Sequence, residues 1–285
     1  MNQNQPKYRH THYIIPILAA MVLFSIFFEN YAVHSSENLT DELVETKFIL
    51  GWEPNEHSIQ SAITFKLSDG WKTYWRNPGE YGIAPTFDWR KSTNIREIKV
   101  SWPTPKLFDQ NGVLVLGYDK TLILPIEIVK KDSSQPVTLN MEVSFGICSD
   151  ICVLKTFYIF KIIGKLENNS PHGLIEKAVK SLTKKYPQED IFSISCKIFW
   201  DEEDDLLLTY DIKFLEPLIS KPIVIFEYLP DQILFKNKNS NASGKSFTEQ
   251  VSLKSIINRE GIIERERINA LFVYNETSFE VKGCN

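Results

Sequence analysis

The sequence predicts an all-β protein of antiparallel β-sandwich type, because apolar residues recur at every second position and turn residues interrupt these runs about every ten residues. Residues 59–67, 122–128 and 137–147 alternate in this way, as half-buried strands do. Asn77-Pro78-Gly79 suits a type II turn, with Pro fixing the first central residue and Gly supplying a positive φ at the second. Helical periodicity is absent between Val44 and Leu166.

The length of the chain allows two domains, and its charge excludes a nucleic-acid-binding protein. A chain of 285 residues with 43% hydrophobic content can bury the cores of two ordinary domains. Lys and Arg total 32 against 36 Asp and Glu, and neither sign gathers into a long arm. We therefore expect no nucleic-acid partner.

The N-terminal residues 1–36 have the layout of an export signal. Lys7 and Arg9 precede the apolar stretch 13–28, which is long for the core of a signal peptide and short for a membrane span of about twenty residues. A cleaved signal peptide and a retained membrane anchor both remain open. In each case the positive charge before the stretch places the rest of the chain outside the cytoplasm, and we expect a periplasmic protein, either free or tethered to the inner membrane.

The exported part divides into two predicted domains. The first β-sandwich covers 40–166 and a second, sandwich-like β domain covers 189–285. Between them, residues 167–188 form a linker and a helix, for which Ser170 is the expected N-cap and Pro171 the first helical residue. The polar stretch 236–245 is expected to be a mobile loop.

Side chains other than cysteine offer little chemistry. His34, His57 and His172 are scattered along the chain, so neither a metal site nor a Ser-His-Asp arrangement is indicated. No Gly-rich phosphate loop precedes a helix. We expect no metal and no cofactor, and the four cysteines remain.

Cys148 and Cys152 lie in the segment FGICSDICV, directly after the longest alternating run and directly before the apolar run 153–163. A hairpin with residues 149–151 as its loop would place the two thiols opposite each other, close enough for a disulfide. With Ile147 directed inward, alternation should put Cys148 on the opposite and more accessible face, where a thiolate can attack or be attacked.

A structural role for this pair is the alternative interpretation. In the chain-entropy description, closing a loop of about five residues contributes only about 2 kcal/mol, whereas a bridge between Cys196 and Cys284 would contribute about 4.6 kcal/mol. The short loop stabilises little, which favours a redox role for Cys148 and Cys152. For Cys196 and Cys284 a structural disulfide is favoured, with unpaired thiols as the alternative.

Several motifs occur in an order that resembles a known family, the N-terminal periplasmic domain of the thiol:disulfide interchange protein DsbD, and more closely its stand-alone relatives. The resemblance covers about residues 40–165. The motifs that carry it are GWKTYWRNPGEYGIAP, SWPTPKLFD, GYDKTLILPIEI and FGICSDIC.

The resemblance implies an immunoglobulin-like sandwich in which Cys148 and Cys152 match the active cysteines. Asp109 matches an acidic residue of the loop that covers them, and Tyr118 matches a family tyrosine. The aromatic residue that shields the disulfide in the family falls at about Asn111. Phe108 is the nearest substitute, and we expect the loop around Phe108 and Asp109 to fold over the cysteines as a lid.

The implied function is that of a protein-disulfide oxidoreductase component, which passes electrons between a thioredoxin-fold protein or membrane electron carrier and periplasmic disulfide-containing clients. The chain has no C-x-x-C motif of its own, so the thioredoxin-fold partner and a membrane carrier of the DsbD or CcdA kind must be separate polypeptides. The alternative is a periplasmic binding or assembly module without redox turnover, for example a chaperone or an accessory of cytochrome c assembly, in which the disulfides are structural.

Overall fold

The structure is a computed structural model that describes residues 42–79, 82–110, 113–166, 170–228, 233–255, 263–274 and 277–284. Contacts divide the chain into Met1–Glu42 and Leu43–Asn285, and all the elements below belong to the second unit. The predicted signal or anchor at 1–36 lies outside the described residues. Within the described ranges, no helix has the length and apolar character needed to cross a membrane.

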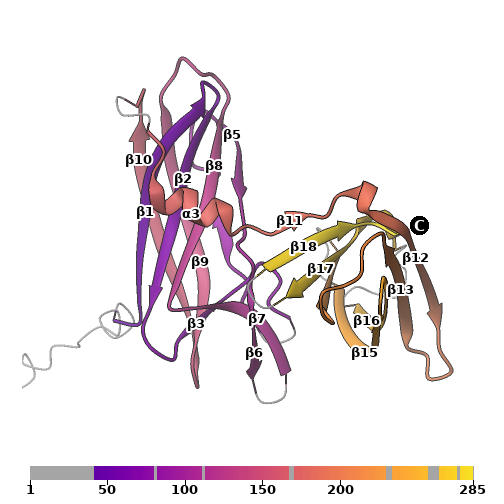
Figure 1. The fold of residues 1–285 in the computed structure, drawn as a ribbon. Helices are drawn as coiled ribbons and strands as arrows, with labels where there is room; N and C mark the ends of the chain where they lie inside the picture. The colour runs from indigo at the N-terminus through magenta and orange to yellow at the C-terminus, as the bar shows by residue number, and fades with distance from the viewer. Residues whose placement is uncertain are drawn as a thin grey trace, which may run out of the picture. The chain divides into compact units, whose positions relative to one another are not determined.

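The first half of this unit is a sandwich of two antiparallel sheets (Figure 1). One sheet has four strands in the order β1-β2-β8-β5, and the other has the order β10-β9-β3-β7-β6, with β4 also paired to β9. The strands are β1 (Val44–Asn55), β2 (Ser58–Leu67), β3 (Lys72–Tyr74), β4 (Thr86–Asp88), β5 (Ile95–Val100), β6 (Lys106–Gln110), β7 (Val113–Asp119), β8 (Thr121–Lys130), β9 (Val137–Cys148) and β10 (Cys152–Ile163). The predicted all-β class is confirmed.

The core of this sandwich follows from the period-2 alternation in the sequence. Inward residues of β2, β8 and β9 are almost completely buried, including Ile63, Leu124 and Ile147. Phe65 and Phe145 face each other from the two sheets, with ring centroids 4.7 Å apart in an edge-to-face arrangement. Burial of this apolar area is what holds the two sheets together and fixes the register of β9.

The connecting helix α3 (Gly173–Lys180) is shorter than the sequence suggested, and His172 rather than Ser170 occupies the N-cap position. The predicted start at Ser170 and Pro171 was wrong. No side chain caps the helix, and Pro171 lies before the N-cap residue rather than in the first turn. Ile175 and Ala178 form its buried face. The helix ends where the Ser181 hydroxyl donates to the carbonyl of Ala178.

The second half is also a pair of antiparallel four-stranded sheets, except that β11 pairs with β18 in parallel. One sheet has the order β11-β18-β17-β14 and the other β12-β13-β16-β15. The elements are β11 (Lys184–Lys185), η1 (Gln188–Asp190), β12 (Ile191–Trp200), β13 (Leu206–Phe214), β14 (Ile223–Tyr228), β15 (Ile233–Ser243), β16 (Ser246–Ser255), η2 (Arg265–Arg267), β17 (Ile268–Tyr274) and β18 (Thr277–Lys282).

The stretch 236–245 is not a loop, as the sequence had suggested, but most of a hairpin. Its polar residues belong to β15, which pairs with β16 from Ile233↔Ser255 to Ser243↔Ser246. Gly244 turns the chain with a φ of +56°, a conformation that glycine adopts without a steric penalty. Polar composition alone did not distinguish a solvent-exposed edge strand from a loop.

A buried ion pair connects the end of β3 to the second half. The Arg76 guanidinium donates to both carboxylate oxygens of Glu227, at 3.1 and 2.7 Å, and also binds Glu280. Glu227 is only 1% exposed. Because an unpaired carboxylate at that depth would cost several kcal/mol, this contact fixes the position of the chain two residues after Tyr74.

Candidate functional site

The cysteine hairpin joins β9 to β10. Cys148 is the last residue of β9, Cys152 is the first of β10, and the two are directly opposed in the register. They form a disulfide with Cα atoms 4.2 Å apart. Residues 149–151 make the loop, in which the Ser149 amide donates to the carbonyl of Ile151 at 3.0 Å.

The two sulfurs of this bond differ in access to solvent. Cys148 is 1% exposed, whereas Cys152 is exposed. The expectation that Cys148 would be accessible was therefore wrong. Alternation did direct Cys148 away from Ile147, but side chains of other strands and of the segment after β3 cover that face of the sheet.

The cover is a small apolar cluster separate from the main core. Tyr74 of β3 and Val115 of β7 are buried with Cys148, and Ile83 and Phe108 pack against them. Gly146, two residues before Cys148 on the same face, makes room for this arrangement. A Cβ at that glycine would lie 2.6 Å from the Cβ of Ile83, so only glycine allows Ile83 to lie this close to the strand.

Tyr74 also contacts the exposed cysteine. Its hydroxyl oxygen lies 3.6 Å from Sγ of Cys152, and because a disulfide sulfur carries no hydrogen the phenol is the donor. Burial raises the pKa of Tyr74, and a hydrogen bond with the Gln110 side chain partly opposes that shift. The phenol therefore keeps its proton wherever thiols exchange, and it can donate equally to a thiolate at Cys152.

Lys72 provides a positive charge beside Cys148 in the strand ladder. It is the register partner of Cys148 on the neighbouring strand β3, and side chains so opposed have Cβ atoms about 5 Å apart. Its ammonium lies 5.4 Å from the centroid of the Phe108 ring. A cation here favours the thiolate form of a reduced Cys148.

The other predicted site residues are placed as follows. Phe108 and Asp109 belong to strand β6 rather than to a loop, and β6 pairs with β7 along its length. Phe108 is half-buried against the cysteine cluster, whereas Asp109 is exposed. Tyr118 is buried in the main core and donates to the carbonyl of Pro103 at 2.7 Å. Asn111 lies outside the described residues.

Cys196 and Cys284 form the second disulfide, with Cα atoms 5.6 Å apart and a sequence separation of 88. Both are nearly inaccessible, at 2% and 3% exposed, and belong to the core of the second half. This bridge connects β12 to the second residue after β18, within the apolar core of the second half. Unlike the hairpin pair, in which Cys152 is exposed, this disulfide has both cysteines buried.

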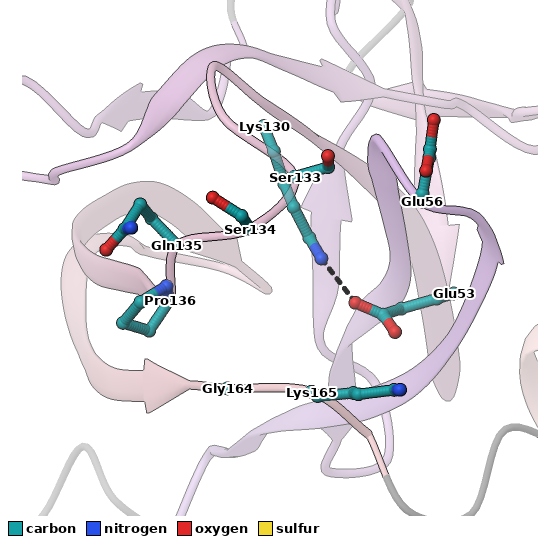
Figure 2. Close-up of a pocket in the computed structure, with 9 residues that line it drawn as sticks. All are labelled: Glu53, Glu56, Lys130, Ser133, Ser134, Gln135, Pro136, Gly164 and Lys165. Atoms are coloured by element: carbon teal, nitrogen blue, oxygen red, sulfur yellow. Dashed lines mark hydrogen bonds and ion pairs between the residues drawn. The ribbon is translucent and has the colours of Figure 1, made fainter.

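A pocket of about 550 Å³ lies at the far end of the first sandwich (Figure 2). It is lined by the β8–β9 connection and by Gly164 and Lys165, just beyond the Ile163↔Val137 end of the β9–β10 hairpin, about 35 Å of strand away from the cysteines. The Lys130 ammonium reaches across it to the Glu53 carboxylate. These two buried charges neutralise each other, so the pocket indicates no particular ligand.

Comparison with known proteins bears on the region that contains the hairpin. Residues 41–162 match the family model of the thiol:disulfide interchange protein DsbD, N-terminal. This region is similar to the DsbD N-terminal family over 122 of the 285 residues. The resemblance found in the sequence motifs is confirmed, and the domain contains Cys148, Cys152 and every residue of the cluster around them.

A solved structure extends the fold comparison beyond the DsbD N-terminal domain. The crystal structure of the N-terminal periplasmic domain of ScsB from Proteus mirabilis is similar with a TM-score of 0.66 and 21% sequence identity. The match covers 85% of this chain and 93% of that chain, so it continues past residue 162 into the second half. At this identity the similarity shows the fold alone. No curated protein sequence matches the chain.

Four residues of the site escaped the sequence analysis: Lys72, Tyr74, Ile83 and Val115. Tyr74 lies in an aromatic-rich segment typical of core packing, and Ile83 follows a turn. The signal that could have found them is strand pairing, because β3 lies between β9 and β7 and so brings its outward residues beside Cys148. Pairing between residues as far apart in the sequence as Lys72 and Cys148 is not readable from alternation.

Proposed function

We propose that this protein is a periplasmic thiol:disulfide interchange module whose Cys148–Cys152 disulfide is the group that is reduced and reoxidised. The observation that carries the proposal is the asymmetry of the bond: one sulfur is exposed at the tip of a hairpin and the other is buried under Tyr74, Val115 and Phe108. A disulfide with one accessible sulfur can be attacked from one side only, which gives a defined leaving group.

The exchange step follows from this asymmetry. A partner thiolate attacks Sγ of Cys152, the Cys148–Cys152 bond breaks, and Cys148 leaves as a thiolate that takes up a proton. A second partner thiolate then attacks the partner sulfur of the mixed disulfide and releases Cys152, which is protonated in turn. Two electrons and two protons pass from the partner dithiol to this protein. The same steps in reverse deliver them to a client disulfide.

The two disulfides differ in how much they should stabilise the fold, which supports a redox role for one and a structural role for the other. In the chain-entropy description, the hairpin bond with a sequence separation of 4 contributes about 2 kcal/mol, and the bond with a separation of 88 contributes about 4.6 kcal/mol. Opening the first bond therefore costs the fold little. Opening the second would remove much of the stability of a typical domain, which is only about 5–15 kcal/mol.

Phe108 and Asp109 are proposed to modulate the exchange. The Phe108 ring packs on the cysteine cluster and so restricts access to Cys148. Asp109 follows Phe108 in β6 and therefore faces the other side of the sheet, so its charge is proposed to disfavour a thiolate at the reduced pair only from a distance, not by contact. Tyr118 of β7 donates to the Pro103 carbonyl and packs in the main core. We propose that it stabilises the position of β7 and does not contact the sulfurs.

The proposed partners come from the family. A thioredoxin-fold protein and a membrane electron carrier would supply electrons, and disulfide-containing clients would receive them. The similarity of residues 41–162 to the DsbD N-terminal family supports this assignment. The solved structure of similar fold is described as a periplasmic domain, which supports the same compartment for this protein. The expected membrane tether at 13–28 remains part of this proposal.

The experiment that tests the function follows both disulfides at once. The oxidised protein is mixed with reduced thioredoxin, quenched at intervals with an alkylating reagent, and mapped by mass spectrometry. Cys148 and Cys152 should become alkylatable within the time that Cys196 and Cys284 remain bonded. A Cys196→Ser and Cys284→Ser variant is the matched control and should exchange at the wild-type rate if it stays folded.

Opening of both disulfides at the same rate would contradict the proposal. So would a Cys148–Cys152 bond that thioredoxin opens no faster than dithiothreitol at equal thiol concentration. Either result would favour the binding or assembly module with structural disulfides.

A further inference from the structure

Strand β10 presents a stripe of exposed apolar side chains that begins next to Cys152. Residues at even positions of β10 share one face of the sheet, because side chains alternate along a strand. On that face Leu154, Tyr158, Phe160 and Ile162 are 61%, 69%, 64% and 70% exposed. We call these four residues the β10 stripe.

The opposite face of β10 is occupied by the core. Ile159 and Ile163 are buried there, and Val153 and Phe157 pack against the same cluster. Apart from Thr156 on one face and two lysines on the other, the strand is apolar on both faces, a pattern typical of strands that are covered on both sides. Within the described residues, β10 pairs only with β9 and lies at the edge of its sheet (Figure 1). Nothing in the described ranges covers the stripe.

Uncovered edge strands of this kind are usually protected by charges, bulges or a short length. β10 has 12 residues in unbroken register with β9. Lys155 and Lys161 on its core-facing side are charges of the kind that oppose pairing along the strand edge, whereas the stripe face carries no charged residue. The four side chains expose on the order of 500 Å², which is as much as the largest apolar patch of a typical monomer and is usual for a binding surface. The stripe is therefore expected to have a partner.

The stripe begins next to the sulfur of Cys152, and this position indicates which kind of partner binds it. Cys152 is the first residue of the same strand, on the same face as the stripe, and Leu154 is the next residue on that face. Any protein whose thiolate reaches Cys152 must lie against this end of β10. The ten residue-to-residue steps from Cys152 to Ile162 span about 33 Å, the width of a standard interface of roughly 800 Å² on each side.

We propose that the β10 stripe is the docking surface of the exchange partner, a redox protein with an apolar surface beside its reactive cysteine. This inference rests on the proposed exchange at Cys152 and adds the surface that selects protein thiols over small thiols. The partner buries the stripe while its sulfur is bonded to Cys152, so that apolar contact orients the attacking thiolate.

The test compares a protein thiol with a small thiol. Reduced thioredoxin is the protein probe and dithiothreitol the small probe, and the second-order rate constant for opening Cys148–Cys152 is measured with each. In the variant Leu154→Ser, Tyr158→Ser, Phe160→Ser, the rate with thioredoxin should fall about tenfold or more, while the rate with dithiothreitol stays within twofold of wild type. The second value also shows that the variant is folded.

Phe192→Ser is the matched control, because Phe192 of β12 is 66% exposed, almost as Phe160 is, but lies in the other half of the chain. It should leave both rates unchanged. An equal thioredoxin rate for the stripe variant and the wild-type protein would overturn the docking proposal alone. A wild-type protein that thioredoxin opens no faster than dithiothreitol would instead overturn the proposed function.

A direct readout of the covered surface completes the test. In the Cys148→Ser variant, Cys152 is joined through a mixed disulfide to a single-cysteine variant of thioredoxin, and hydroxyl-radical footprinting is applied. Tyr158 and Phe160 should become protected relative to the unlinked protein, and Phe192 should not. Two results would refute the proposal, because each would show that this chain itself covers the stripe. One is protection of Tyr158 and Phe160 already in the unlinked protein. The other is a wild-type protein that sediments as a dimer when the stripe variant does not.

Discussion

The hydroxyl of Tyr74 lies 3.6 Å from Sγ of Cys152, across a sheet in which β9 separates their two strands. The contact joins a residue of the buried cluster to the exposed sulfur. It gives Cys152 a hydrogen-bond donor that stays protonated, because burial raises the pKa of Tyr74. Tyr74 therefore both helps to bury Cys148 and contacts Sγ of Cys152, the sulfur proposed to be attacked.

Replacing Tyr74 by Phe should lower the reactivity of a reduced Cys152, because a hydrogen bond to a charged acceptor is worth about 1.5–3 kcal/mol and the phenol would stabilise the thiolate. Measured on the Cys148→Ser background, alkylation of Cys152 at pH 7 should slow by roughly threefold to tenfold. Tyr158→Phe, which removes a hydroxyl from the exposed face of β10, is the control. An unchanged rate in the Tyr74 variant would show that the contact has no effect on the thiolate.

Lys72→Met should slow opening of the disulfide, because Cys148 leaves as a buried thiolate beside this cation. At an effective dielectric constant near 20, with solvent screening of a half-buried ammonium, the loss is about 1 kcal/mol, or roughly fivefold in rate with dithiothreitol. The wild-type rate should also fall as salt is added, and the variant should lose most of that dependence. Lys155→Met, on the core side of β10, is the matched control; the same loss there would refute the assignment.

Phe108→Ala should speed reduction of Cys148–Cys152 by dithiothreitol severalfold, because the ring packs against the cluster that buries Cys148. The fold should persist, since Phe108 is only half-buried and lies outside the main core. Phe235→Ala, half-buried in the second half of the chain, provides the comparison for loss of an aromatic ring. If both variants react like the wild-type protein, Phe108 does not shield the bond.

Alternation in the sequence was sufficient to predict the sandwich, the hairpin and the pair of opposed cysteines. These features depend on side chains near each other in the chain, such as Ile147 and Cys148, whose positions follow from a period of two. The exposure of Cys148 did not follow, because the residues that bury it come from β3, β7 and β6, and their pairing with β9 is set by the whole sheet.

The helix and the hairpin of β15 show the limits of local signals. Ser170 and Pro171 form a good helix-start pattern, yet the helix begins at Gly173 because its position is set by burial of Ile175 and Ala178 against the sandwich. The polar run in β15 has little strand propensity, and pairing with the alternating strand β16 determines its structure.

Glu249 should make stability depend on pH. Burial raises the pKa of its carboxyl, partly opposed by hydrogen bonds with Ser240 and Asn237. The folded state therefore binds the proton more tightly than the unfolded state, so the free energy of unfolding falls as pH rises from about 4.3 through the folded pKa. Glu249→Gln keeps an acceptor for Asn237 and should be more stable than wild type in urea at pH 7.

Near pH 4 this advantage of the Glu249→Gln variant should disappear, because the wild-type carboxyl is then protonated in both states. Glu202→Gln, at an exposed position, is the control and should leave the pH dependence as it is. A Glu249→Gln variant with the wild-type stability at both pH values would show that burial does not disfavour the carboxylate.

A redox titration of both disulfides tests the central claim most directly. The protein is equilibrated in dithiothreitol buffers of graded potential, alkylated, and scored separately for Cys148–Cys152 and Cys196–Cys284. The accessible bond that closes a short loop should have a reduction potential above about −300 mV, in the range of exchange-active disulfides, and the buried long-loop bond should lie below it. A Cys148–Cys152 potential equal to or below that of Cys196–Cys284 would mark both bonds as structural and contradict the exchange function.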